Sequence, residues 1–371
     1  MLIRTGRFFS ERIGHFIADT SEQLIRKKLQ ETKSIDIWSV GEIVNKQWLV
    51  MVSRNMKIFG SWARYLNSWN SYIPGGAKHK IPRTQTGSRD PDGLFTKLPV
   101  AISFLPEEDT AAKNWLTKRG WKEGEPFVCL LVRDDSYTLT LNPRPKDLND
   151  CNYRNSDIKS YVDAIEYLTN NGVWVLRMGR KMNSKIEVNS PYVIDYSFDS
   201  EKSDLLDIWL FANCLGAIST GTGLDILCPI YGKPILYLNT LPLRHINTSA
   251  NAIWVSKNLI WKSSGKSLSL TEYLNCPAMS DKEFTDLGIE INDLSSSEIL
   301  LGVQEFFCRV TDTWIETQDN LQLQSKFMDI ILNWPLVDSA YISWTHPNFR
   351  VGARWLESKG ELFLADWNGK I

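Results

Sequence analysis

The hydrophobic pattern is most regular in the middle of the chain, where short apolar runs alternate with segments whose apolar side chains recur at helical spacing. A short, continuous apolar run is typical of a strand that is buried on both faces. The expected strands are 127–132, 173–176, 192–194, 215–218 and 234–238, and the expected helices between them are 157–170, 203–213 and 223–231. This alternation predicts a parallel sheet with right-handed crossovers.

The pattern is less regular on either side of this central part. Before residue 121 it predicts strands at 1–4, 35–40 and 99–105, helices at 15–29 and 107–119, and a helical stretch at 44–72 that breaks near Gly60. Residues 270–332 are mainly helical in pattern, and residues 334–371 form a tail. Because the chain has 371 residues, we expect two domains, each with its own core.

Polar residues or glycines follow four of the central strands at the point where each strand ends. They are Arg133 and Asp134, Arg177 and Gly179, Asp195 and Tyr196, and the loop Ser219–Gly223 with Thr220, Gly221 and Thr222 between its ends. Because the carboxyl ends of parallel strands meet at one edge of a sheet, we expect these residues to face a ligand site. Arginine suits phosphate there, since its planar fork stays charged and grips two oxygens. The alternative for Arg133 and Asp134 is a salt bridge that caps the sheet, and the motif supports both equally.

The loop Ser219–Gly223 lies between a buried strand and the start of a helix. Backbone N–H groups and hydroxyls in such a place form a receptor for a diphosphate, although packing in a tight turn is an alternative. The loop contains neither GxGxxG nor GxxxxGK[ST], and it follows the fourth central strand, which argues against an NAD-binding unit. Together with Arg133 and Arg177, it indicates a nucleotide-diphosphate site that works without a metal ion.

Composition excludes several classes of protein. The hydrophobic fraction is 43% and the charged fraction 23%, as in a globular protein, and no apolar run is long enough to span a membrane. The charged N-terminus does not resemble a signal peptide, so we expect a cytoplasmic protein. The six cysteines are widely spaced and have no nearby histidines, which favours buried, reduced thiols over a metal site.

The first part of the chain is basic. Residues 1–90 contain 15 Lys+Arg against 7 Asp+Glu, although the net charge of the whole chain is −1. A basic surface suits an anionic membrane or a phospholipid-linked substrate. The alternative is a solvated surface without a partner. We expect no binding to nucleic acid, because the charges are scattered and no aromatic-rich motif accompanies them.

Several motifs, taken in order, resemble a family of bacterial GT-B-type glycosyltransferases associated with surface polysaccharide gene clusters. They are Arg12–His15, Phe127–Asp134, Tyr153–Ile158, Val175–Gly179, Ile194–Tyr196, Ser219–Pro234 and the late segment Leu321–Phe327. The end of the second motif, Val-Arg-Asp, is also similar to the arginine motif of GDP-fucose-using fucosyltransferases, but only locally. In the family a histidine usually precedes Val-Arg-Asp, and Leu131 stands there in this chain.

The resemblance implies an α/β, GT-B-like fold in which two Rossmann-like domains face each other across a cleft. Residues 1–120 would form the acceptor-side domain, residues 121–335 the nucleotide-sugar-binding domain, and residues 336–371 a C-terminal helical tail that packs back across the cleft. Arg154 and Asn155, within the third motif, would join the residues that bind the nucleotide sugar. The implied activity is transfer of a hexosyl or deoxyhexosyl group to a glycan or lipid-linked glycan acceptor, with no cofactor besides the donor.

The catalytic base of such a transfer would come from the N-terminal domain. The candidates are His15 and Asp19, since a neutral histidine near pH 7 accepts protons readily. The alternative for His15 is helix capping or orientation of the acceptor. Two other functions remain open. One is a sugar-nucleotide epimerase on the same fold. The other is a nucleotide- or glycan-binding protein without catalytic activity, and Leu131 in place of the family's histidine is the reason to consider it.

Overall fold

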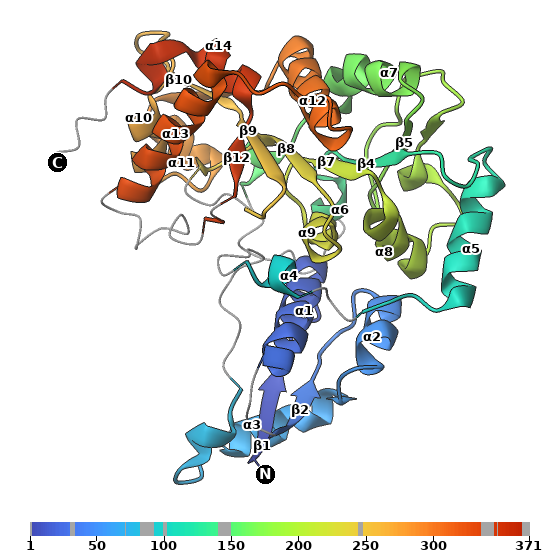
Figure 1. Cartoon of the computed structure of the whole chain (residues 1–371). Helices are drawn as coiled ribbons and strands as arrows, with labels where there is room; N and C mark the ends of the chain where they lie inside the picture. Colours follow the sequence, from blue (N-terminus) through green and yellow to red (C-terminus); the bar gives the residue numbers. More distant parts are fainter. Residues whose placement is uncertain are drawn as a thin grey trace.

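The computed structural model describes residues 2–29, 34–70, 72–81, 93–98, 102–139, 150–243, 248–334, 345–346 and 348–365. They form two parallel sheets, each flanked by helices, with the smaller sheet below the larger one in Figure 1. The expected α/β class and the GT-B-like arrangement of two parallel units are therefore confirmed.

The smaller sheet contains the strands β1 (Leu2–Arg7), β2 (Ser34–Ser39) and β3 (Ile58–Phe59), which pair in that order. Helix α1 (Ile13–Leu29) connects the first two strands, and α2 (Lys46–Ser53) precedes the third. Trp38 stacks on Phe8 with 4.0 Å between ring centroids and covers the sheet. The expected order of strand, helix and strand is confirmed, but β3 was missed because the surrounding residues have helical spacing.

Short helical segments complete the first part of the chain. They are η1 (Ser61–Ala63), α3 (Arg64–Asn70), η2 (Gly76–His79), α4 (Leu94–Lys97) and α5 (Pro106–Thr117). The strand expected at 99–105 is wrong for residues 102–105, which are not in a strand, and its first three residues lie outside the described ranges. Helix α5 lies against the larger sheet's helix α8 (Asp204–Asn213), where Trp209 Nε1 donates to Asp109 at 2.9 Å.

The larger sheet has seven parallel strands in the order β12-β9-β8-β7-β4-β5-β6. Their bounds are β4 (Phe127–Leu131), β5 (Trp174–Arg177), β6 (Val193–Ile194), β7 (Gly216–Ser219), β8 (Ile235–Thr240), β9 (Ala252–Ser256) and β12 (Arg350–Val351). Counted from β4, this is the doubly wound order 3-2-1-4-5-6 with one more strand at the edge. The order reverses between β4 and β7, which makes their carboxyl ends the topological switch point of the sheet.

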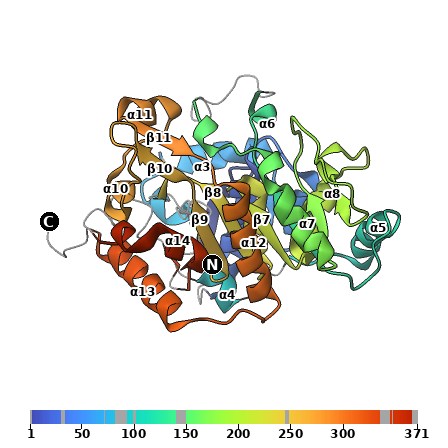
Figure 2. The ribbon, with the colours of Figure 1, turned by 90° about the horizontal axis from the view of Figure 1, so that it is seen from above.

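Helices cover both faces of this sheet. Helices α7 (Val162–Asn170) and α12 (Ser296–Val310) lie together on one face, above the strands in Figure 1 and in front of them in Figure 2. Helices α8 and α9 (Leu227–Ile230) lie on the opposite face. The strands β4, β5, β7, β8 and β9 are almost entirely buried, which explains why they read as continuous apolar runs.

The segment after β9 forms a small extension that the sequence described only as helical. It contains the antiparallel pair β10 (Asn258–Trp261) and β11 (Ile289–Asn292), with α10 (Leu270–Asn275) and α11 (Asp281–Asp286) between them. Helix α13 (Gln318–Asn333) follows α12. The pattern missed β9 itself, although this strand is buried along its whole length.

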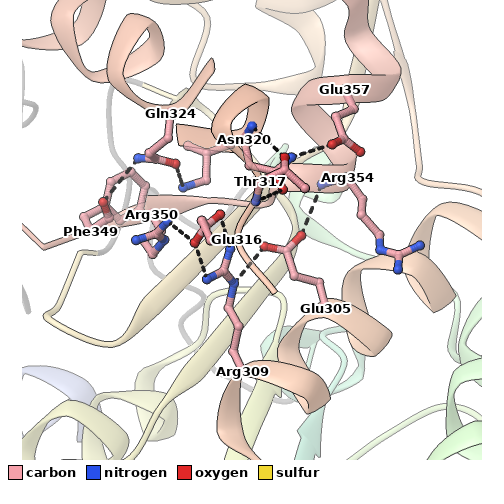
Figure 3. Close-up of polar contacts among 11 residues, drawn as sticks. Glu305, Arg309, Glu316, Thr317, Asn320, Gln324, Phe349, Arg350, Arg354 and Glu357 are labelled. Carbon is pink, nitrogen blue, oxygen red and sulfur yellow. Dashed lines mark hydrogen bonds and ion pairs between the residues drawn. The ribbon is translucent and has the colours of Figure 1, made fainter. Parts of the chain in front are cut away.

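The end of the chain returns to the larger sheet. Strand β12 pairs with β9, and α14 (Ala353–Phe363) packs against α12 and α13. Figure 3 shows the polar contacts that join these elements: Arg309 bonds Glu305 and Glu316 at 3.0 Å each, and Arg350 bonds Glu316 at 2.6 Å. His346, at the start of this segment, lies beside Gly93 before α4.

The domain limits expected at residues 120 and 335 stay a prediction, and residues 336–344 and 366–371 of the expected tail lie outside the described residues. In the part of the chain that the structure describes, no helix combines the length and the apolar character needed to cross a membrane.

Candidate functional site

The switch point brings together two of the loops that the sequence singled out. Leu131, the last residue of β4, is in register with Ser219, the last residue of β7. Beyond the strands, the backbone N–H of Arg133 donates to Thr220 Oγ1 at 2.9 Å, and the N–H of Thr220 donates to the Leu131 carbonyl at 3.1 Å. Arg133 and the loop Ser219–Gly223 therefore lie side by side at the edge where doubly wound sheets bind their ligands.

A buried carboxylate shapes the loop Ser219–Gly223. Asp225 Oδ2 accepts from Ser219 Oγ and from the N–H of Thr222, both at 2.7 Å. The N–H of Gly221 donates to Ser219 Oγ at 3.1 Å, and Gly221 has a φ of +81°, which a glycine adopts without strain. These bonds occupy two of the N–H groups that the sequence suggested for a diphosphate. Because these N–H groups already donate within the loop, we expect arginine side chains beside it to be the main donors to a bound diphosphate.

Burial changes the chemistry of the Asp225 carboxylate. Its side chain is buried beneath the loop, and burial raises the pKa to about 6 even though the bonds from Ser219 and Thr222 favour the charged form. Asp225 was not selected from the sequence as a nucleotide-sugar-binding residue, because it follows the glycines and resembles an ordinary helix-start residue.

Two guanidinium groups lie at this edge. Arg154 Nη2 donates to the carbonyl of Gly221 at 3.1 Å, and Arg133 Nη1 donates to the carbonyl of Cys151 at 3.5 Å. Both side chains are half-buried, so each keeps part of its surface toward solvent. Arg154 comes from the 3₁₀ turn η4 (Asn152–Arg154), and Asp281 at the start of α11 fixes this turn by accepting from the N–H groups of Asn152 and Tyr153 at 2.8 and 2.6 Å.

A cavity of about 180 Å³ opens beside Arg154. Its lining combines backbone and hydroxyl groups of the strand-end loops with aromatic and apolar side chains, and consists of Tyr153, Arg154, Thr220, Gly221, Tyr237, Thr240, Leu241, Pro242, Trp254 and Met279. The polar groups of this lining, together with its aromatic rings, suit a small molecule that carries both polar and apolar parts. The residues from β8 and β9 were not selected from the sequence, although β8 itself was expected as a strand; β9 was not.

Lys257 is a further charged group that the sequence did not reveal. It follows β9 directly, is almost fully buried, and donates from Nζ to the carbonyl of Asn155 at 2.6 Å and to the carboxylate of Asp293. Burial lowers its pKa, and Asp293 opposes this effect. The lysine therefore fixes the backbone beside Arg154. The signal that could have found it is a lysine directly after the apolar run 252–256.

The expected residue Asn155 contributes this carbonyl, while its side-chain Nδ2 donates to Asn152 Oδ1 at 3.2 Å. Asp134 forms a turn: Oδ1 accepts from the N–H and Oγ of Ser136 at 2.9 and 2.7 Å, and Oδ2 accepts from the N–H of Asn183 at 2.8 Å. Asp134 thus connects the loops after β4 and β5 and does not pair with Arg133 in these contacts.

Arg177 lies in a different environment from Arg133. Its side chain is only 1% exposed, donates from Nη1 to the carbonyl of Ser184, and lies 3.7 Å from Asp195 Oδ2. Burial lowers the pKa of this guanidinium, with Asp195 and Asp134 acting in the opposite direction. None of these atoms lines the cavity, so Arg177 is placed to hold the loops after β5 and β6 together.

The remaining expected residues surround Arg177. Asp195 also accepts from the N–H of Ile186 at 2.9 Å and from Ser197 Oγ at 2.6 Å. The fully buried Tyr196 donates to Asp207 at 2.8 Å, and burial raises the pKa of both groups. Gly179 has a φ of +142°, and a Cβ there would lie 2.1 Å from Met182. The predicted site residues thus lie in two groups. The switch-point group consists of Arg133, Arg154 and the loop Ser219–Gly223, and the β5–β6 group consists of Arg177, Gly179, Asp195 and Tyr196.

The start of α1 lies against the loop Ser219–Gly223 from the other side. A Cβ on Gly14 would lie 3.0 Å from Gly223 Cα, and a Cβ on Gly223 would lie 3.1 Å from the backbone nitrogen of Gly14. His15 and Asp19 are one helical turn apart on α1, and both are half-buried. The His15 ring centroid is 5.5 Å from that of Phe9. The smaller unit thus places the end of α1 that carries His15 at the switch-point group.

The described residues contain no cluster of three or more His, Cys, Asp or Glu side chains that could hold a metal ion. Leu131, at the position of the family's histidine, is buried at the end of β4.

Comparison with models of protein families finds no match, and comparison with curated proteins finds none either. Three solved structures that resemble this chain are glycosyltransferases. A family 9 enzyme from Veillonella parvula DSM 2008 is 11% identical over 83% of this chain and 98% of its own, with a TM-score of 0.49. The ADP-heptose lps heptosyltransferase II of E. coli is 9% identical over 83% and 99%, with a TM-score of 0.46. The iron-containing dodecameric glycosyltransferase TibC from enterotoxigenic E. coli H10407 is 11% identical over 84% and 78%, with a TM-score of 0.44. Because these similarities are weak, the proposals below rest on the site itself.

Proposed function

We propose that this protein is a glycosyltransferase that moves a sugar from a nucleotide-diphosphate donor to a surface glycan or its lipid-linked precursor. The observation that carries the proposal is the meeting of Arg133, Arg154 and the loop Ser219–Gly223 at the switch point, beside a cavity. A doubly wound sheet binds nucleotides at this position.

The two arginines supply the electrostatics that this reaction needs. When the bond between the sugar and the diphosphate breaks, negative charge develops on the leaving phosphate oxygens, and donors placed in advance stabilise it. Arg133 and Arg154 are fixed through backbone carbonyls on neighbouring loops, so they need little reorganisation. In this proposal they bind the diphosphate, while Asp225 and Lys257 hold the loops that carry it.

The cavity limits how the donor is placed. Its volume of about 180 Å³ is smaller than the roughly 300 to 1,000 Å³ of a site that encloses a drug-sized ligand. We assign it to the nucleoside end of the donor, beside Trp254 and Tyr237. The diphosphate would lie at Arg133 and Arg154, and the sugar would point toward the start of α1.

The acceptor side of the proposal rests on α1. His15 and Asp19 lie on the helix whose first turn contacts Gly223, so a hydroxyl activated there would approach the sugar from the smaller unit. We propose His15 as the proton acceptor and Asp19 as the group that orients it or replaces it. Replacement of both residues should lower sugar transfer without lowering donor affinity.

A thermal-shift panel tests the donor site. A ligand that binds only the folded state raises the melting temperature, so one of GDP, UDP, ADP, CMP and dTDP should stabilise the protein above the others. The shift should be lost in Arg154→Ala and retained in Lys113→Ala, which removes a positive charge from α5, away from the cavity lining. Absence of any shift, or an equal shift in Arg154→Ala, would overturn the donor site.

A transfer assay tests the activity itself. The sugar nucleotide that matches the winning base should release its diphosphate, and labelled sugar should appear in a glycan or lipid-linked glycan fraction. Conversion of the donor into another sugar nucleotide without transfer would identify an epimerase instead. We also propose that turnover persists in excess EDTA, since arginines take the role of the metal. Loss in EDTA with recovery in magnesium or manganese would contradict this part.

A further inference from the structure

The end of the smaller unit opposite the large sheet carries an unusual surface. The segment from Lys57 to Lys80 contains β3, η1, α3 and η2, and Figure 1 shows α3 at the bottom of the molecule, beside the first strand. We call the exposed side chains of this segment the α3 patch. Its apolar members are Trp62, Tyr65, Trp69, Tyr72 and Ile73, and its basic members are Lys57, Arg64, Lys78 and Lys80.

Large aromatic side chains point to solvent in the α3 patch. Trp62 is 58% exposed, Trp69 64% and Tyr72 84%. Within the described ranges, Trp62 and Trp69 are the only exposed tryptophans, whereas tryptophans elsewhere in those ranges are buried or half-buried. Trp62, Tyr65 and Trp69 are three and four residues apart, a spacing that places them along one face of a helical segment. An outward stripe of this kind marks an interaction surface.

The charged side chains of this segment are all of one sign. Residues 43–89 contain eight Lys+Arg and no Asp or Glu. Among the described residues, Lys57, Arg64, Lys78 and Lys80 are exposed on the same segment as the aromatic side chains. Nearby Arg54 is neutralised by Glu108 of α5, but no acidic residue of the segment itself offsets the other charges. The partner of this surface should therefore be anionic and should accept aromatic rings.

We propose that the α3 patch docks on an anionic lipid bilayer. Tryptophan and tyrosine prefer the headgroup level of a membrane, because one end of each ring system is apolar and the other is polar. Lysine and arginine beside them attract acidic headgroups, and their long stems lie along the apolar surface. A second copy of the chain fits less well, since a two-fold interface would bring the same basic patch against itself. This proposal is independent of the glycosyltransferase activity.

Sedimentation of the full chain with lipid vesicles tests the proposal. The protein should pellet with vesicles of phosphatidylcholine and phosphatidylglycerol, should remain in solution with phosphatidylcholine alone, and should be released by salt. The variant Trp62→Ser/Trp69→Ser/Tyr72→Ser should reduce the bound fraction at least about tenfold, because it removes the interfacial rings. Lys78→Glu/Lys80→Glu should also reduce the bound fraction on the anionic vesicles, because it reverses two of the charges that attract acidic headgroups.

A matched control separates the patch from a general effect of exposed apolar groups. Ile315→Ser/Leu362→Ser removes two side chains that are 83% and 84% exposed in the C-terminal half, and it should bind vesicles like the wild type. All variants alter exposed side chains, and melting curves by circular dichroism verify that they remain folded. Three results would overturn the proposal: no binding to anionic vesicles, unchanged binding by the aromatic variant, or a wild-type dimer in light scattering that the aromatic variant converts to monomer.

Discussion

Arg133 and Arg177 follow the same kind of sequence pattern and have different surroundings. Each comes at or just after the end of a buried strand of the large sheet, in β4 and β5 respectively. Arg133 is half-buried beside the loop Ser219–Gly223, while Arg177 is 1% exposed and bonded to Ser184 and Asp195. The difference follows from strand order. Of these two strands, only β4 borders the switch point, where the sheet leaves room for a ligand, so an arginine at a strand end indicates a binding site only at that position.

The largest effect should come from Arg177. Replacement by alanine removes a buried guanidinium and leaves Asp195 without its cation, and breaking such a pair costs about 3 to 5 kcal/mol of unfolding free energy. Urea unfolding of Arg177→Ala should show this loss, whereas Arg133→Ala should remain within about 1 kcal/mol of the wild type. A stable Arg177→Ala that has lost nucleotide binding would reverse the assignment of the two arginines.

Arg133 should matter for the ligand instead. In Arg133→Ala the affinity for the nucleoside diphosphate should fall by about 1.5 to 3 kcal/mol, because charge-assisted bonds to phosphate are lost. The monophosphate should be affected less. Isothermal calorimetry measures both, and Lys113→Ala serves as the control for a change in net charge. Equal diphosphate affinity in Arg133→Ala and wild type would remove this arginine from the site.

Gly223 tests the contact between the loop Ser219–Gly223 and helix α1 of the smaller unit. A valine there would meet Ile13 Cγ2 at 2.9 Å and the Gly14 nitrogen at 3.1 Å, measured from its Cβ, so it would push α1 away from the loop. Overpacking of this kind costs about 1 to 3 kcal/mol. Gly14→Val strains the same contact from the other side. The double variant should therefore lose less stability than the sum of the two single variants, and additive losses would show that the contact is not shared.

Asp225 should have the smallest effect, visible in the pH dependence of stability. Its folded pKa of about 6 lies above the ordinary value of 3.8, so between these pH values the folded protein binds a proton that the unfolded chain has released. The contribution of this residue to stability is therefore present below about pH 4 and is lost as pH rises through about 6. Relative to the wild type, Asp225→Asn should gain about 1 to 2 kcal/mol between these pH values, because the amide carries no charge to bury.

Urea unfolding of both proteins across this pH range measures the difference. The asparagine oxygen can still accept from Ser219 and Thr222, so the loop should keep its shape. A difference between the two proteins that does not change with pH would show that folding leaves the pKa of Asp225 unshifted.

The sequence by itself determined five of the seven strands of the large sheet, β4 to β8. Strands β4, β5, β7 and β8 are buried on both faces and are apolar until their last residues, so a local pattern identifies them. Strand β3 was not predicted, because it has only two residues within a helical pattern. Strand β9 was not predicted either, because no individual elements were assigned to the sequence directly after β8. The short strand pairs β10–β11 and β12–β9 depend on partners distant in the chain.

Only the tertiary structure decided which polar residues form the candidate site. From the sequence, the polar residues at four strand ends had equal weight as site residues. In each case they directly follow an apolar run, and this local pattern does not separate one strand end from another. The strand order placed Arg133 and Ser219–Gly223 together and buried Arg177 with Asp195 at the other side. Lys257 and the cavity walls from β8 and β9 joined the site through contacts between strand ends that are distant in the chain. Such contacts are set by strand order and burial, which depend on the whole chain and not on any local pattern.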